Sequence, residues 1–229
     1  MTRLQKTDPE YAAILERFQY GEAMQDPDVS LPPEWRCPAI LAALLGCGGV
    51  DAFREALPGF LEQGLSPVAI KEIVYQGTDY LGYGRVLPFL HAANEVFAAH
   101  GIPLPLPGQA TVTPQNRLEE GVAVQTALFG DRMRTAWQAG TVNRFLAQNC
   151  FGDYYTRNGL SLRVRELVTF CFLAALGGCD PQLAAHAKGN LHIGNDADLL
   201  SRAVLCCLPY IGYPRTLNAL ACIREAQNA

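Results

Sequence analysis

The stretch Tyr80-Leu81-Gly82-Tyr83-Gly84-Arg85 returns 130 residues later as Tyr210-Ile211-Gly212-Tyr213-Pro214-Arg215. The match extends beyond this hexapeptide, because six further pairs recur at the same offset: Gly48 and Gly178, Gly59 and Gly189, Leu61 and Leu191, Gly64 and Gly194, Leu90 and Leu220, and Glu95 and Glu225. This period is much longer than that of solenoid repeats. We therefore predict a tandem duplication with pseudo-two-fold symmetry, with the two copies over residues 34–100 and 161–227.

Helix boundaries are well marked along the chain. Five residues have the position and side chain of an N-terminal helix cap: Ser66, Thr113, Ser161, Asp180 and Asp196. Apolar residues recur at helical spacing between the caps and the following glycines, for example over 114–129, 142–150, 162–176 and 181–193. No alternating stretch predicts a strand. The sequence predicts an all-α fold, divided into an N-terminal unit over 1–108 and a C-terminal unit over 109–229.

Composition limits the classes of function. A chain of 229 residues with 49% hydrophobic and 17% charged residues is typical of an ordered globular protein. The net charge of −4 and the absence of a Lys/Arg-rich run argue against binding to nucleic acid or to a membrane surface. The first residues lack the apolar stretch of a signal peptide, and the eight cysteines lack the spacing of a small disulfide scaffold. We expect a cytoplasmic protein that acts on a small molecule.

Motifs for metals and nucleotides are missing. The chain has four histidines, no His-Glu-x-x-His and no Cys-x-x-Cys, which are the usual starting points of a zinc site. Neither Gly-x-Gly-x-x-Gly nor the phosphate-binding loop motif occurs. The sequence therefore predicts neither a metal nor a cofactor.

Candidate catalytic residues gather around one predicted helical hairpin. Glu166 lies in an otherwise apolar helix, Cys179 lies at the turn after Gly177-Gly178, and His186 follows in the next helix. An antiparallel hairpin brings His186 alongside Glu166, where the carboxylate can orient the imidazole. The imidazole can move a proton or activate a thiol, although the neighbouring Asp180 opposes formation of the Cys179 thiolate.

Each of these residues also has a structural interpretation. Cys179 can serve as a small apolar residue, His186 as a core histidine, and Glu166 as the partner of Arg163 or Arg165. The duplication favours the functional interpretation, because the N-terminal copy lacks all three. The residues at the corresponding positions are Arg36, Gly49 and Ala56. We therefore expect one site per chain, in the C-terminal unit.

Several segments of residues 143–227 are typical of one family: Cys150 to Arg157, Arg165 to Val168, Leu173 to Cys179, and Pro209 to Arg215 followed by Asn218 to Leu220. They resemble the carboxymuconolactone decarboxylase family, which also contains the alkylhydroperoxidase D-like proteins. The resemblance implies an all-α fold with helical hairpins packed between subunits. It also implies a homo-oligomer, either a trimer that mimics a hexamer of single units or a dimer.

The peroxidase branch of this family uses a Glu, a Cys-x-x-Cys pair and a nearby His as a thiol relay. Glu166 and His186 fall at suitable places, but no second Cys follows Cys179 at the required spacing. Cys150 or Cys171 would have to resolve an oxidised Cys179.

The decarboxylase branch needs acid/base groups and no thiol. By resemblance, His186 moves a proton at the carbon that loses carbon dioxide, Glu166 orients it, and Arg157 or Arg163 holds the substrate carboxylate. We favour such an enzyme of a small lactone or organic acid. The alternatives are a thiol peroxidase using Cys179 and a non-catalytic member of the family that binds a ligand or acts as a scaffold.

Overall fold

The computed structural model describes residues 3–228, and the regular secondary structure of this part of the chain is all helical, with no strand. The prediction of an all-α fold is confirmed. The elements follow one another as α1 (Arg3–Thr7), α2 (Pro9–Glu16), η1 (Arg17–Glu22), α3 (Ala23–Gln25), α4 (Pro33–Cys47), α5 (Val50–Glu62), α6 (Pro67–Leu81), α7 (Tyr83–Ala99), α8 (Arg117–Phe129), α9 (Met133–Ala136), η2 (Trp137–Ala139), α10 (Thr141–Phe145), η3 (Leu146–Tyr155), α11 (Leu162–Leu176), α12 (Asp180–His192), α13 (Ala197–Ile211) and α14 (Tyr213–Gln227).

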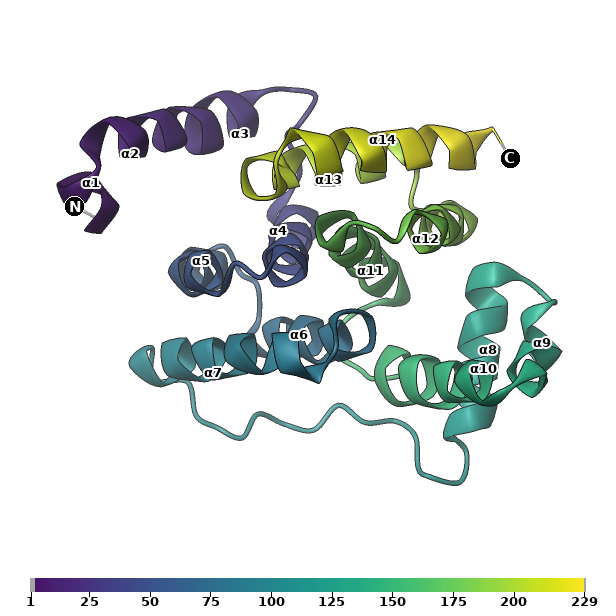
Figure 1. Cartoon of the computed structure of the whole chain (residues 1–229). Coiled ribbons are helices and arrows are strands. Elements are labelled where there is room, and N and C mark those ends of the chain that lie inside the picture. The colour runs from purple at the N-terminus through teal and green to yellow at the C-terminus, as the bar shows by residue number, and fades with distance from the viewer. Residues whose placement is uncertain (1–2, 229) are drawn as a thin grey trace.

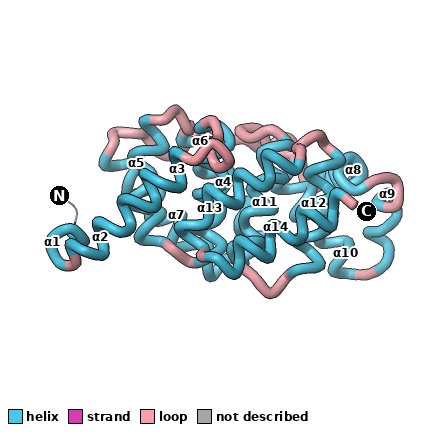
Figure 2. The backbone as a smooth tube through the Cα atoms, turned by 90° about the horizontal axis from the view of Figure 1, so that it is seen from above, coloured by secondary structure: helices cyan, strands magenta, loops and turns pink. Residues whose placement is uncertain are grey.

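Two central helices, α4 and α11, organise the fold (Figure 1). Helix α4 packs against α11, α13 and α6, so helices from both halves of the chain enclose one core. The α1–α3 arm extends from one end of the molecule, and α8–α10 form the opposite end (Figure 2). Among residues 3–228, no helix combines the length and apolar character needed to cross a bilayer.

The helix bounds repeat along the chain. Residues 50–62 and 67–81 form α5 and α6, and the same bounds displaced by 130 residues are those of α12 and α13. Helices α4 and α7 match α11 and α14 nearly as well. This agreement supports the proposed duplication, since the two sets of helices begin and end at equivalent residues.

Three of the five predicted caps are confirmed. The side chains of Ser66, Ser161 and Asp196 each accept a hydrogen bond from the backbone N–H three residues later. Asp180 instead begins α12, and Cys179 occupies the cap position without a side-chain bond. Thr113 lies in a turn in which its backbone N–H donates to Asn116, so that α8 begins only at 117.

The helix predicted over 142–150 continues further than its apolar pattern indicates. After α10 the chain adopts the wider π-helical winding of η3, which ends at Tyr155. Helix α8 lies very close to this segment. A Cβ atom on Gly121 would come within 1.9 Å of the Ala147 carbonyl oxygen, and one on Gly152 within 2.2 Å of the Arg117 carbonyl oxygen. The missing side chains allow the two backbones to touch, which periodicity alone does not predict.

Replacing Gly121 by alanine should therefore destabilise the protein by about 1–3 kcal/mol, because the methyl group forces α8 away from η3. Urea unfolding monitored by circular dichroism measures the loss. Gly59→Ala is the matched control, since its Cβ would meet no atom within 4 Å. It should stabilise the helix by about 0.5–1 kcal/mol. A Gly121→Ala protein as stable as the wild type would contradict the close approach.

Candidate active site

The hairpin of α11 and α12 brings Glu166 and His186 together as predicted. Gly177 and Gly178 adopt positive φ angles of 72° and 70° between the two helices, which glycine tolerates without strain. The Nδ1 atom of His186 lies 2.5 Å from Oε1 of Glu166. Because the carboxylate accepts the Nδ1 proton, Nε2 is the ring nitrogen left for chemistry.

Glu166 is fully buried, with 0% of its surface exposed, and its second carboxylate oxygen is also bonded. Oε2 accepts a hydrogen bond of 2.9 Å from the Tyr155 hydroxyl, which also lies 2.5 Å from Thr169 Oγ1. The Tyr80 hydroxyl donates to Tyr155 at 3.1 Å and extends this chain. The carboxylate is thus held in one orientation and can act on a ligand only through His186.

A cavity of about 450 Å³ opens beside the imidazole. Its lining residues come from six helices and the turns next to them: Asp79, Tyr80, Gln125, Phe129, Arg132, Met133, Leu146, Phe151, Leu173, Leu176, Cys179, Gln182, Ala185 and His186. Tyr80 and Phe129 meet the imidazole edge-on, with ring centroids 5.6 and 5.4 Å away. A concave, mainly apolar wall with few polar groups is typical of a site for a small organic molecule.

Both halves of the chain build this cavity. Asp79 and Tyr80 belong to α6, within the N-terminal unit, whereas His186 and Cys179 belong to the C-terminal unit. The expectation of a site formed by the C-terminal unit alone is therefore incomplete. The N-terminal unit has Ala56 at the position that corresponds to His186, but it supplies part of the cavity wall.

Comparison with known proteins matches the region of the chain that contains Glu166 and His186. Residues 140–225, which include the hairpin, match the model of the Carboxymuconolactone decarboxylase family. Over these residues, which are a little over a third of the chain, the protein is similar to this family. A 4-carboxymuconolactone decarboxylase of Acinetobacter baylyi is 28% identical over 117 residues, which cover 48% of this chain and 87% of the relative.

Cys179 lines the cavity but differs from the activated thiol of the family's peroxidase branch. Its Sγ donates to the Leu173 carbonyl oxygen at 3.5 Å. Burial raises the pKa of the thiol, and the adjacent Asp180 carboxylate raises it further. Both effects favour the thiol over the nucleophilic thiolate.

The two cysteines considered as resolving partners lie elsewhere. Cys150 is buried and donates to the Tyr80 hydroxyl at 3.5 Å, and burial raises its pKa well above the usual value. Cys171 is buried in the central core of α11. All eight cysteines are free. No three His, Cys, Asp or Glu side chains within residues 3–228 are grouped so as to hold a metal ion.

The two arginines expected to bind a carboxylate lie outside the cavity. Arg157 forms a bidentate ion pair with Glu72, with its Nη2 atom 2.9 Å from Oε1. Arg163 donates to Asn195 and to the Gly194 carbonyl oxygen, and it stacks over Trp35. The arginine that does line the cavity is Arg132, in the turn between α8 and α9. No motif marks it in the sequence, because its position depends on how α8 docks against α12.

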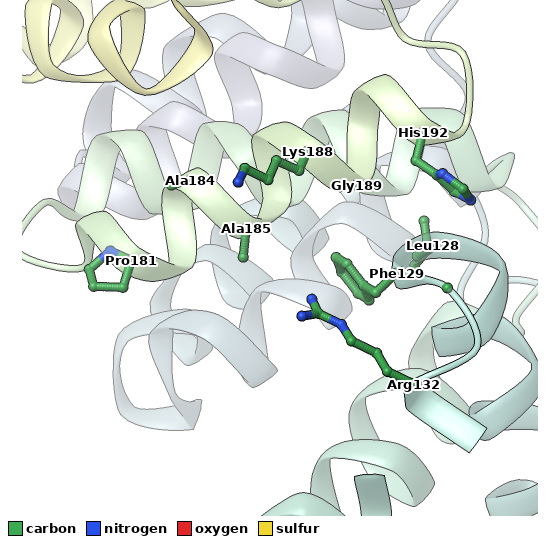
Figure 3. A pocket seen from close by; sticks show the side chains of 10 residues that line it. Leu128, Phe129, Arg132, Pro181, Ala184, Ala185, Lys188, Gly189 and His192 are labelled. Carbon is green, nitrogen blue, oxygen red and sulfur yellow. The ribbon is translucent and has the colours of Figure 1, made fainter. Parts of the chain in front are cut away.

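Arg132 also lines a second hollow, of about 430 Å³, on the other side of Phe129 and Ala185 (Figure 3). Figure 3 shows Arg132 extending toward α12, which contributes Lys188 and His192 to this hollow. None of the residues that line it is acidic. The positive charges of Arg132 and Lys188 are therefore suited to attracting an anionic ligand toward the neighbouring cavity.

Proposed function

We propose that the protein is a carboxy-lyase that removes carbon dioxide from a small lactone carrying a carboxylate, by acid/base chemistry. The observation that supports this best is the Glu166–His186 pair in the wall of a cavity large enough for such a molecule. A fixed imidazole with one free nitrogen is the usual means of moving a proton to or from carbon. The 4-carboxymuconolactone decarboxylase relative acts on a molecule of this class.

Each group has a definite task in this proposal. Arg132 attracts the substrate carboxylates at the edge of the cavity, since a guanidinium binds carboxylates in a bidentate manner. The apolar walls formed by Phe129, Leu173 and Leu176 strip water from the carboxylate that is lost, which favours a neutral product such as carbon dioxide. His186 then supplies a proton to carbon, and Glu166 keeps the imidazole aligned.

The direct test is to incubate the purified protein with 4-carboxymuconolactone and related lactone acids and to measure the carbon dioxide released. A folded protein that releases none from any of them would exclude the proposed reaction. The corresponding measurement on a His186 variant separates catalysis by this site from spontaneous decarboxylation.

The thiol peroxidase remains the second candidate, because Cys179 and His186 line the same cavity. We expect Cys179→Ser to keep the decarboxylase turnover within about twofold, since that reaction uses no thiol. Cys47 is the matched control for oxidation: it is also half-buried, and its Sγ also lies 3.5 Å from a backbone carbonyl oxygen. Mass spectrometry after a pulse of hydrogen peroxide should find that Cys179 and Cys47 are oxidised to a similar extent. Selective oxidation of Cys179 would instead favour the peroxidase.

We further propose that the chain works as a homo-oligomer, either as a trimer of duplicated chains or as a dimer. The exposed apolar side chains of the N-terminal arm support this proposal, because large apolar side chains are costly to leave in water. They are Tyr11, Ile14 and Tyr20.

A further inference from the structure

Two polar side chains in the cavity wall have no role in the Glu166–His186 pair. Asp79 lies near the end of α6, and Gln125 lies in α8 with 2% of its surface exposed. Oδ2 of Asp79 and Oε1 of Gln125 are buried, and neither accepts a hydrogen bond of ordinary geometry among residues 3–228. The Cys150 thiol, a weak donor, is the group that lies near the Asp79 carboxyl. Buried polar atoms are nearly always bonded, so two unpaired oxygens in one cavity wall call for a partner that enters from outside.

The surroundings of Asp79 favour its neutral form. Burial raises the pKa of its carboxyl group to about 7, and the Asp153 carboxylate adds to this effect, whereas the Cys150 thiol partly opposes it. The titratable and charged groups that face it come from η3, α12 and the turn after α8: Cys150, Asp153, Tyr154, His186 and Arg132. Below about pH 7, Asp79 therefore exists largely as a carboxylic acid that can donate a hydrogen bond.

We propose that Asp79 and Gln125 form an oxygen anchor, a pair of hydrogen-bonding side chains that holds the ring carbonyl oxygen of the lactone. Asp79 donates its O–H. Gln125 turns about its terminal torsion, which is soft, and donates an amide N–H. The anchor rests on the proposed function for the class of ligand. Through Asp79 it also gives the N-terminal unit, which has Ala56 at the position corresponding to His186, a direct part in the site.

The carbonyl oxygen is where charge develops in the proposed reaction. When the bond to the carboxylate breaks, carbon dioxide leaves as a neutral molecule. The electron pair of that bond moves through the conjugated ring to the carbonyl oxygen. The resulting enolate keeps the single negative charge of the lost carboxylate until His186 transfers a proton to carbon. Hydrogen bonds placed at that oxygen beforehand stabilise the enolate more than the substrate.

A matched pair of inert ligands tests the anchor without relying on turnover. The probes are γ-carboxy-γ-butyrolactone and tetrahydrofuran carboxylic acid, which differ only in the ring carbonyl oxygen. Calorimetry at about pH 6, where Asp79 is protonated, should show the wild type binding the lactone about tenfold more tightly. Asp79→Leu and Gln125→Leu should each reduce this preference to about twofold or less. Asp79→Asn, which keeps an N–H donor, should retain most of it.

His186→Ala should keep the preference for the lactone while lowering turnover of the substrate by about 10²–10⁴-fold. Failure of the anchor and failure of the proposed reaction are therefore distinguishable. If the wild type binds the two probes equally, or binds neither, the anchor is wrong. The anchor is also wrong if Asp79→Leu and Gln125→Leu keep the wild-type preference for the lactone. That result is expected if a bound water, and not the ligand, forms the hydrogen bonds to Asp79 and Gln125.

The stability of the same variants provides a second, independent readout. Removing an unpaired buried oxygen should raise Tm by about 2–4 °C, whereas removing a structural hydrogen bond should lower it. The raised pKa means that the folded state holds a proton which the unfolded state has released. Asp79 therefore lowers stability progressively as pH rises from about 4 to about 7. The increase in Tm that Asp79→Asn causes should therefore become larger as pH rises over this range. If Asp79→Asn has a lower Tm than the wild type at pH 7, the anchor is contradicted.

Discussion

Replacing His186 by alanine should lower the release of carbon dioxide from 4-carboxymuconolactone by about 10²–10⁴-fold, the usual contribution of a positioned general acid or base. The imidazole is the group with a free ring nitrogen in the cavity wall, and Glu166 is too deeply buried to replace it. The loss should fall mainly on kcat, because the apolar walls and Arg132 still bind the substrate. Steady-state assays of carbon dioxide release measure it.

A second substitution distinguishes orientation from proton transfer. Glu166→Gln keeps the shape of the side chain but accepts the Nδ1 proton less strongly, so we expect a loss of about 10–100-fold. The matched control is His91→Ala, because His91 is an exposed histidine on α7, away from the cavity. A His186→Ala protein that is correctly folded and turns over within twofold of the wild type would exclude this site as the source of the activity.

Replacing Glu72 by glutamine should destabilise the protein by about 3–5 kcal/mol. Glu72, on α6, accepts hydrogen bonds from Arg157 and from Arg165 on α11, and the Arg165 side chain is fully buried. Burial lowers the pKa of Arg165 from its usual range, and the Glu72 carboxylate opposes this shift. Without that carboxylate a buried positive charge has no counterion, and the contact between the two halves weakens. Urea unfolding gives the change in free energy.

Two further variants sharpen this test. Asp51→Asn removes one of the two acidic partners of Arg54, in a largely exposed ion pair, so it should cost less than about 1 kcal/mol. The double replacement Glu72→Met with Arg165→Leu should recover part of the lost stability, because it removes the fully buried positive charge of Arg165 together with the carboxylate. Arg157 also loses Glu72, but its side chain is 20% exposed and water can solvate its charge in part. A Glu72→Gln protein within 1 kcal/mol of the wild type would show that Arg165 has another adequate partner.

The sequence by itself determined the features that depend on neighbouring residues. Ser66, Ser161 and Asp196 mark helix starts because a cap needs only its own side chain and the next turn of backbone. The pairing of Glu166 with His186 follows from one tight turn between two helices. Periodicity and a short loop suffice for that prediction.

Only the tertiary structure decided which distant segments complete the cavity. Periodicity shows that a face of α6 or α8 is buried, but it does not show which helix covers it. No pattern in the sequence therefore marks Asp79, Gln125 or Arg132. The prediction that Arg157 or Arg163 holds the substrate carboxylate differs from the contacts in the structure, where Arg157 pairs with Glu72 and Arg163 with Asn195. These positions depend on the close contact of α8 with η3 and on the docking of α6 against α11, which are set by packing between residues far apart in the chain.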